Sequence, residues 1–462
     1  MKLSFHGANK TVTGSCHLLE CLGKRILIDC GLLQGNRELE DENNLPFGFD
    51  PAAVDMVLLT HAHLDHCGRL ALLTKRGFRG EVIATSATFD LARLVILDVA
   101  HMHEEETRNR ARDSLVRGAA QVEPPLYSLL DATRTLSQFG RAADYGKPIE
   151  LAPGISGTFY DAGHILGSAS ILIEIDEPSN KRTILFSGDI GNAGRPLLRA
   201  PQTPASAEFV VMESTYGDRS HKPFPFTVAE FYEAITSTFA RGGNVLIPTF
   251  ALERAQELLY FLRQGVEDGL LSRTIPVFVD SPMAVSATEI FRHHPESYNP
   301  RLADFFARGE DPFGVPGLKL VRERSESMAI NKVSGGAVIM AGSGMCTGGR
   351  IRHHMRHNLW NPKSSIIFVG YATLGTPARD IIDGAKSINL FGDQIPVRAG
   401  IHTINGFSAH ADQQELVAWH RSIAGKTVTF LVHGDAPVMT QFERCLSGSR
   451  VEIPDLNQSY DL

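Results

Sequence analysis

The segment Thr60-His61-Ala62-His63-Leu64-Asp65-His66 carries the strongest signal in this chain of 462 residues. It closes an apolar run, residues 54–60, that we predict as a buried strand, and it precedes a predicted helical segment that begins at Gly68. In the extended part, residues two apart point the same way, so His61 and His63 can bind one ion. As the chain turns into the helix, Asp65 and His66 come round towards a second ion. Imidazole and carboxylate ligands together suit zinc or a similar divalent metal.

A chance cluster of histidines on a polar loop is the alternative to a metal site. Three histidines and one aspartate within six residues, at the end of an apolar strand, argue against that alternative. Two ions require more ligands than this segment provides, and the sequence offers three candidates. Each candidate follows an apolar run and has a glycine beside it, an arrangement that places ligands on one rim of a sheet: His164, Asp189 and His433.

Length and composition restrict the class of protein. A single hydrophobic core stops growing at about 250–300 residues, so we expect two structural units. The apolar content of 43% is too high for disorder, and no apolar run approaches the roughly 18 residues of a membrane span. The N-terminus has no apolar signal core, and the six cysteines include no CxxC pair. We therefore expect a cytoplasmic protein with reduced thiols and no membrane partner.

The pattern of predicted strands and helices changes twice along the chain. β-rich segments give way after Gly217 to alternating strands and helices, a pattern that predicts a parallel, doubly wound sheet. From about Val397 the segments are β-rich again. We therefore predict one domain, residues 1–217 and 397–462, that is interrupted by an inserted domain, residues 218–396.

Taken together, these motifs resemble those of the metallo-β-lactamase superfamily. The residues that carry the likeness are Asp29, the segment 61–66, His164 and Asp189. Three further residues resemble the additional motifs of its β-CASP branch: Glu213, His410 and His433. That branch includes the endonuclease subunit of the eukaryotic polyadenylation factor and many ribonucleases. The likeness covers essentially the whole chain. It implies a mixed α/β fold, an αββα metallo-β-lactamase sandwich interrupted by a Rossmann-like β-CASP domain with a parallel sheet.

The resemblance also implies a role for each motif residue around two Zn²⁺ ions, with other divalent metals such as Mn²⁺ as an alternative. The ligands of one ion are His61, His63 and His164, those of the other are Asp65, His66 and His433, and Asp189 bridges the two. Asp29 is similar to the carboxylate that orients a metal-bound imidazole. The position of His433 resembles the RNA-cleaving members, because the DNA-processing members have an apolar residue there.

A dinuclear site of this kind predicts hydrolysis of a phosphodiester bond. A hydroxide held between two zinc ions about 3.5–4 Å apart is a nucleophile at neutral pH. His410 is the candidate general acid for the departing ribose oxygen and Glu213 its carboxylate partner, a surface ion pair being the alternative. Asp65 and Asp189, which hold the ions, belong to the same catalytic set. We therefore predict a zinc-dependent ribonuclease with its active site in the cleft between the two domains and, by resemblance, products with 5′-phosphate and 3′-hydroxyl ends.

The charge of the inserted domain repels RNA less than the charge of the remainder does. It has 19 Lys and Arg against 18 Asp and Glu, whereas the remainder has 26 against 34. A glycine-rich segment within it follows a predicted strand and precedes a predicted helix, where backbone amides and nearby arginines can hold phosphate. The candidate phosphate-binding residues are Gly342, Ser343, Gly344, Arg350, Arg352 and Arg379, the last behind a second glycine-containing loop, residues 370–376. The glycine spacing is not GxGxxG, which argues against a dinucleotide site; a purely structural turn is the remaining alternative.

Two other functions are compatible with these motifs. One is hydrolysis of a small ester, thioester or lactam, against which the long insertion and the Glu213–His410 pair argue. The other is a non-catalytic RNA-binding scaffold, against which the complete ligand set argues. Only 29 residues follow His433 and the N-terminus begins directly with the catalytic domain, so the nearest likeness is the compact bacterial form. The expected partner is single-stranded RNA; we favour endonuclease cleavage and leave exonuclease activity and a homodimer open.

Overall fold

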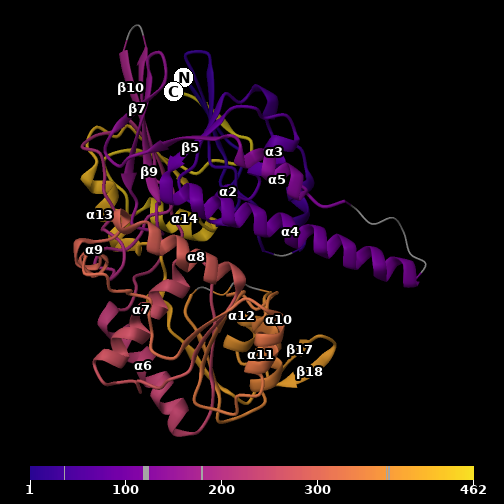
Figure 1. The fold of residues 1–462 in the computed structure, drawn as a ribbon. Helices are drawn as coiled ribbons and strands as arrows, with labels where there is room; N and C mark the ends of the chain where they lie inside the picture. The colour runs from indigo at the N-terminus through magenta and orange to yellow at the C-terminus, as the bar shows by residue number, and fades with distance from the viewer. Residues whose placement is uncertain (36, 118–123, 178–179, 371, 373–374) are drawn as a thin grey trace. The chain divides into compact units, whose positions relative to one another are not determined.

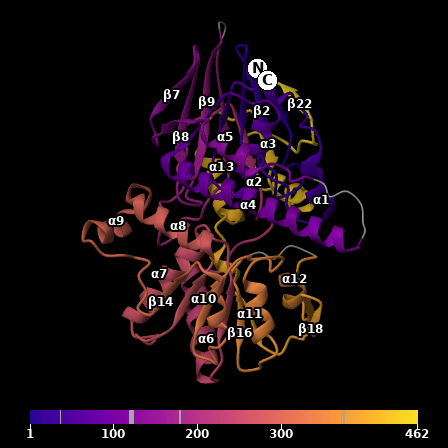
Figure 2. The same ribbon diagram turned by 45° about the vertical axis from the view of Figure 1, so that its right-hand side comes forward.

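The computed structural model describes residues 1–35, 37–117, 124–177, 180–370, 372 and 375–462, so residues 371, 373 and 374 of the second glycine-containing loop lie outside the described part. The chain divides into two units (Figure 1, Figure 2). Unit 1 comprises Met1–Ser220 and His410–Leu462, and unit 2 comprises His221–Ala409. Each unit has its own sheets and its own buried apolar cluster.

Two seven-stranded sheets form the centre of unit 1. The first has the order β22-β1-β2-β3-β4-β5-β6, with strands Ser459–Asp461, Lys2–Phe5, His17–Cys21, Lys24–Ile28, Met56–Leu58, Glu81–Thr85 and Phe139–Ala143. The second has the order β21-β20-β11-β10-β9-β8-β7, with strands Arg450–Glu452, Val428–Val432, Phe209–Glu213, Asn180–Phe186, Ala169–Glu177, Ile155–Asp161 and Pro148–Ala152. Side chains of both sheets, among them Phe5, Ile28, Phe186 and Phe430, meet in one buried cluster. The two sheets therefore pack face to face.

Helices cover the outer faces of this sandwich. On the second sheet, α13 (Gln413–Ser422) and α14 (Ala436–Glu443) contribute Trp419 and Phe442 to a cluster with the strand residue Met212. On the first sheet lie α3, α4 and α5, of which α4 contacts β5 and β6. These three helices are Leu70–Lys75, Ser86–Arg117 and Leu129–Leu136, and the shorter ones of unit 1 are Arg37–Asp41 (α1) and Leu64–Cys67 (α2). The order helix, sheet, sheet, helix confirms the predicted αββα sandwich.

Unit 2 is built on a six-stranded sheet in which every pairing is parallel. Its order is β14-β13-β15-β12-β16-β19, with strands Leu318–Val321, Val277–Asp280, Val338–Ala341, Val245–Pro248, Ser365–Phe368 and Gly400–Thr403. The helices are Phe224–Ala240 (α6), Arg254–Glu267 (α7), Pro282–His293 (α8), Pro300–Ala307 (α9), Arg324–Ile330 (α10), Ile351–Asn358 (α11) and Pro377–Ile382 (α12). β12, β13, β15 and β16 are buried along their whole length, as expected for parallel strands covered on both faces. The predicted parallel, doubly wound sheet is therefore confirmed. A hairpin of β17 (Ser387–Leu390) and β18 (Asp393–Pro396) completes the unit.

The chain returns to unit 1 later than its sequence pattern indicates. We expected the return at Val397, but β19 pairs in parallel with β16 and the unit boundary lies between Ala409 and His410. A short β-rich segment has the same pattern whichever sheet it joins, so the sequence did not reveal its partner. The other junction, between Ser220 and His221, lies close to the expected Gly217.

The longest helix is α4, with 32 residues. Its second half is polar, with Glu104, Glu105 and Glu106 in succession. Across the described residues, no helix combines the length and the apolar character that crossing a bilayer requires.

Candidate metal centre

The histidine segment lies where β4 of unit 1 ends and the chain turns into α2. Thr60 and His61 are buried directly after the strand, and His63 is the N-cap residue of the helix. Asp65 and His66 lie inside this one-turn helix. The predicted turn from strand to helix is present, but the helix begins at Leu64, and Gly68, the predicted start, is its C-cap residue. The turn directs all four candidate ligands of the segment towards the same region.

Three imidazole nitrogens and one carboxylate oxygen converge in the first ligand cluster. His63 Nδ1 lies 3.1 Å from His61 Nε2 and 3.1 Å from His164 Nε2. Asp189 Oδ2 lies 3.5 Å from each of these two Nε2 atoms. His164 comes from the turn between β8 and β9, and Asp189 from the residues that follow β10. The structure therefore brings these four predicted residues together.

A second ligand cluster lies beside the other oxygen of the same carboxylate. Asp189 Oδ1 lies 3.2 Å from His66 Nε2 and 3.7 Å from His433 Nδ1. His433 Nε2 lies 3.3 Å from Asp65 Oδ2. His433 follows β20, the parallel neighbour of β11, so the last ligand comes from the far end of the sequence. The two oxygens of Asp189 thus face the two clusters, the arrangement expected of a bridging carboxylate.

The donor atoms of these clusters fit divalent metal ions. His66 Nε2 and both carboxylate oxygens of Asp189 are buried without a hydrogen-bond partner among the described residues. Buried polar atoms are normally paired, because leaving them unpaired is costly. In a tetrahedral zinc site with Zn–N distances of about 2.0–2.1 Å, neighbouring ligand atoms lie about 3.3 Å apart. The separations of 3.1–3.5 Å within the first cluster match that spacing.

Burial and neighbouring charge set the protonation of these histidines. Burial lowers the pKa of His61 and His164, and it lowers the pKa of His63 to about 4. These imidazoles are therefore neutral at pH 7, which is the form that binds a metal. Burial also opposes the charged form of His66, but the carboxylates of Asp189 and Asp29 outweigh it and raise the pKa of that ring. A metal ion at the second cluster therefore competes with a proton.

Asp29 supports the second cluster from behind. Its carboxylate lies 2.7 Å from His66 Nδ1 and accepts hydrogen bonds of 2.8 Å from the Thr60 amide and the Thr60 hydroxyl. With its Nδ1 occupied in this way, His66 presents Nε2 to Asp189. Asp29 follows β3 with a φ of +59°, a left-handed conformation that aspartate tolerates. The position agrees with the orienting role expected for this residue.

Glu213 and His410 form a pair at the edge of the first cluster. Glu213, the last residue of β11, is completely buried, and both its carboxylate oxygens lie 3.2 Å from His410 Nδ1. His410 Nε2 lies 3.9 Å from Asp189 Oδ2. Burial disfavours the imidazolium, but the Glu213 and Asp189 carboxylates outweigh burial and raise the pKa of His410 to about 9. Because the carboxylate of Glu213 is buried, the alternative of an exposed surface pair does not apply.

Two further residues of the site, Thr60 and Thr215, were not predicted from the sequence. Thr60 donates to Asp29 and lies 3.1 Å from His61 Nδ1, so it connects the supports of both clusters. Thr215 Oγ1 lies 3.0 Å from His433 Nδ1. Their places beside motif residues, directly before His61 and two after Glu213, are the only hint that the sequence contains.

The predicted phosphate-binding residues all lie in unit 2, where the arginines have internal neighbours. Arg350 donates to Asp280 Oδ1 (2.7 Å) and to the carbonyl of Arg322 (2.6 Å). Arg352 lies over the ring of Phe391, 4.7 Å from its centroid. The remaining arginine, Arg379, donates to Asp383 Oδ2 at 2.8 Å. Residues 342–344 occupy the loop between β15 and α11, as predicted. The structure thus places the loop as expected but gives each arginine a contact within the protein.

Three domain families match the sequence. The Metallo-beta-lactamase superfamily matches residues 10–95, the Beta-Casp domain residues 255–381, and the Zn-dependent metallo-hydrolase RNA specificity domain residues 394–454. Among solved structures, a protein of unknown function from Enterococcus faecalis V583 aligns with a TM-score of 0.56, 14% identity and coverage of 100% of this chain and 99% of that chain. At that identity the likeness concerns the fold alone.

Several characterised relatives are similar over most of their length. Ribonuclease TTHA0252 of Thermus thermophilus is 40% identical over 435 residues, 94% of this chain and 93% of the relative. An RNase J-like protein of Methanocaldococcus jannaschii is 30% identical over 439 residues, 94% of this chain and 92% of the relative. The transcription termination factor FttA of Methanococcus maripaludis is 32% identical over 454 residues, 94% of this chain and 67% of the relative.

Proposed function

The chain belongs to the metallo-β-lactamase superfamily, in the branch that carries a β-CASP domain, and from that membership we propose that it is a two-zinc endoribonuclease. It is a metal-dependent hydrolase that acts on RNA. The number and identity of the ions, the mode of cleavage and the product ends are parts of the proposal. One observation carries it: the Glu213–His410 pair and the two ligand clusters meet at the same carboxylate, Asp189.

The two clusters would hold the ions through the atoms that converge in them. His61, His63 and His164 would hold one ion, Asp65, His66 and His433 would hold the other, and Asp189, which faces both clusters, would contribute to each. When bound, divalent ions at these positions lower the pKa of water to about 7 and neutralise charge on a phosphodiester.

His410 supplies the proton for the leaving group. Its Nδ1–H donates to Glu213, which fixes the ring and leaves Nε2 directed towards Asp189. The buried carboxylate favours the imidazolium, so Nε2 carries a proton at neutral pH. Attack of water at phosphorus forms a new P–O bond and breaks the bond to the ribose 3′ oxygen, and the proton from Nε2 passes to that oxygen. The proton that the water loses goes to solvent, from which Nε2 is reprotonated. The products are then a 3′-hydroxyl and a 5′-phosphate.

Unit 2 contributes contacts to RNA in this proposal. Residues 342–344 offer backbone to phosphate, with Arg352 and Arg379 as nearby cations. Because Arg350 binds Asp280 and a backbone carbonyl, we assign it to holding this loop.

We also propose a cytoplasmic location, which the six free thiols support.

The test uses zinc-loaded full-length protein with three substrates: labelled single-stranded RNA, single-stranded DNA of the same sequence, and a small ester. We expect cleavage of RNA only, with internal cuts in both 5′-labelled and internally labelled RNA and ends that carry 5′-phosphate. His410→Gln should keep two bound ions and lose about 10²- to 10⁴-fold in turnover, the usual contribution of a general acid. His101→Gln, an exposed histidine of α4, is the control. Cleavage of the ester but not of RNA would refute the proposal, and full turnover by His410→Gln would remove that residue from it.

A further inference from the structure

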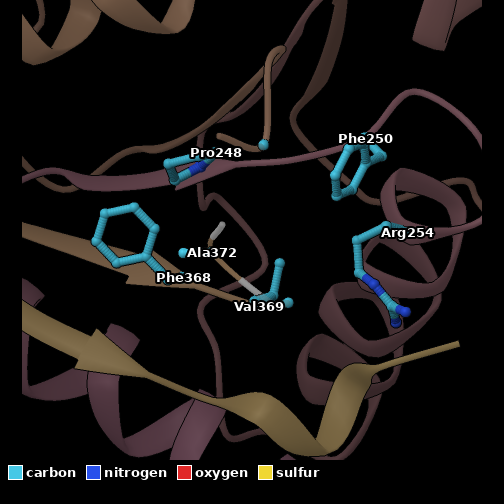
Figure 3. A pocket seen from close by; sticks show the side chains of 8 residues that line it. Pro248, Phe250, Arg254, Phe368, Val369 and Ala372 are labelled. Carbon is cyan, nitrogen blue, oxygen red and sulfur yellow. The ribbon is translucent and has the colours of Figure 1, made fainter. Parts of the chain in front are cut away.

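A crevice lies at the carboxyl ends of three adjacent strands of unit 2 (Figure 3). Pro248 closes β12, Phe368 closes β16, and Gly344 lies in the loop after β15. From β12 the chain proceeds to β13, and from β15 it proceeds to β16, so these two connections run in opposite directions across the sheet. Ligands of open parallel sheets bind at such a point, where neighbouring strands send their connections in opposite directions. The topology therefore marks this crevice as a candidate binding site.

An exposed aromatic ring forms one wall of the crevice. Phe250 has 47% of its surface exposed, and Figure 3 shows it across the crevice from the buried Phe368. Gly344 lies so close to this ring that a Cβ there would come within 2.9 Å of Phe250 Cε2. The missing side chain thus lets the loop backbone lie against the ring. An aromatic ring with one part supported and the rest exposed is a stacking surface for a planar group.

Size and polarity restrict what the crevice can bind. Its interior is small, with about 10 Å³ of space for the centre of a water-sized sphere, which is room for about one water molecule. Its lining is mainly apolar, and the one charged residue among its described lining residues, Arg254, pairs with Glu257. The apolar lining does not favour a phosphate, and the surface that the crevice offers to a larger planar group is the exposed part of the Phe250 ring.

A buried carboxylate holds the loop that borders the crevice. Asp280 is completely buried at the end of β13 and accepts hydrogen bonds from Arg350 (2.7 Å) and from Ser327 (2.6 Å). His354 Nε2 lies 2.7 Å from the same carboxylate. Because Arg350 precedes α11 and His354 lies within it, Asp280 fixes the start of this helix and the end of the loop 342–350. A wall that is ordered before binding loses less entropy when a ligand arrives.

From these observations we propose that the exposed ring of Phe250, at the edge of the crevice, is a subsite on which one nucleobase of single-stranded RNA stacks; this rests on the proposed action on RNA. RNA-binding proteins commonly hold unpaired bases against aromatic rings. Residues 218–396 have nearly balanced charge, with 19 basic and 18 acidic residues. They therefore repel a polyanion such as RNA less than the net negative remainder of the chain does. The base lies against the exposed part of the Phe250 ring, and the backbone beside it follows the loop 342–350.

The test measures binding of fluorescein-labelled single-stranded RNA to the full-length protein by anisotropy, with EDTA present to prevent cleavage. Phe250→Ala should raise Kd about 5-fold or more, the equivalent of losing one base-to-ring stack. Phe250→Trp keeps a ring and should bind as the wild type does. Phe226→Ala removes another exposed phenylalanine of unit 2, 65% exposed, that does not line the crevice, and serves as the control. Thermal melting of each variant checks its fold.

A series of RNAs that each lack one base then locates the stacked position. At one position the missing base should weaken wild-type binding, while Phe250→Ala adds no further loss. Two results would overturn the subsite. One is that, at every position, the loss of affinity from the missing base and the loss from Phe250→Ala simply add; the other is an unchanged Kd for Phe250→Ala. Wild-type protein that cleaves RNA but shows no dependence on Phe250 refutes the subsite alone. Binding that depends on Phe250 in a protein that cleaves no RNA refutes the nuclease proposal alone.

Discussion

Replacing Asp29 by asparagine tests how the second ligand cluster is held. The Asp29 carboxylate lies 2.7 Å from His66 Nδ1 and accepts two hydrogen bonds of 2.8 Å from Thr60. Asparagine tolerates the φ of +59° at this position and has the same size, so the backbone and the packing are preserved. Its Oδ1 can still accept from the Thr60 amide, which keeps His61 in place. The substitution therefore removes the negative charge opposite His66 and, because the Thr60 hydroxyl donates to the same Oδ2 atom, that acceptor as well.

The expected change in metal affinity follows from the contact between Asp29 and His66. A hydrogen bond to a charged group contributes about 1.5–3 kcal/mol. Loss of a partner that orients a metal-bound imidazole typically lowers metal affinity by about 10- to 100-fold, which corresponds to about 1.4–2.8 kcal/mol. The two ranges agree. We therefore expect a loss of this size for the ion bound by His66, and little change for the ion bound by His61, His63 and His164.

The assay is a titration of metal-free protein with Zn²⁺ in competition with a chromogenic chelator, fitted to two sites. Asp55→Asn is the matched control, because Asp55 is also a carboxylate of unit 1 but pairs with Lys24 (2.8 Å) near the surface. Equal melting temperatures of the two metal-free variants would establish that both are folded. Unchanged affinity at both sites, or equal losses at both, would refute the reasoning.

Three further predictions concern single side chains. His433→Ala should weaken one ion and leave the other bound, which metal analysis after dialysis measures; two ions of unchanged affinity would exclude His433 as a ligand. Asp280→Asn leaves Arg350 without its buried carboxylate and should lower the free energy of unfolding by about 3 kcal/mol, with metal content unaffected; an unchanged melting temperature would contradict this. Burial lowers the pKa of His420 to about 4, below the 6.5 of an unfolded chain, so the unfolded chain takes up the proton first as pH falls. Stability should therefore decline between pH 6.5 and 4, and denaturant unfolding should show a smaller decline for His420→Gln, whereas identical declines would contradict the assignment.

The local part of the metal site was predictable from the sequence because its ligands are near neighbours in the chain. His61, His63, Asp65 and His66 share one strand-to-helix turn, so periodicity alone places them on common faces. His164, Asp189 and His433 were predictable as rim residues, since each follows an apolar strand. Which of them faces which ion depends on the register of separate sheets, and only the resemblance to known families assigned it.

Contacts between distant positions were beyond the reach of sequence patterns. Glu213 and His410 are 197 positions apart, and no local pattern relates them. Arg350 looked like a phosphate ligand because it follows a glycine-rich loop, yet its partner Asp280 lies 70 positions earlier in the chain. An arginine has the same sequence signature whether it binds a ligand or a buried carboxylate. The same ambiguity explains the boundary expected at Val397, since β19 has the composition of a strand in either unit.

The order in which the ribosome delivers the chain has a consequence for the site. His410 and His433 come from the second segment of unit 1, after the whole of unit 2 has been made. A nascent chain that stops within unit 2 has four histidines of the two clusters, His61, His63, His66 and His164, but lacks the proposed proton donor His410 and the proposed ligand His433. If these two residues act as proposed, the site is incomplete until the second segment of unit 1 has been made, and a chain truncated within unit 2 would not cleave RNA.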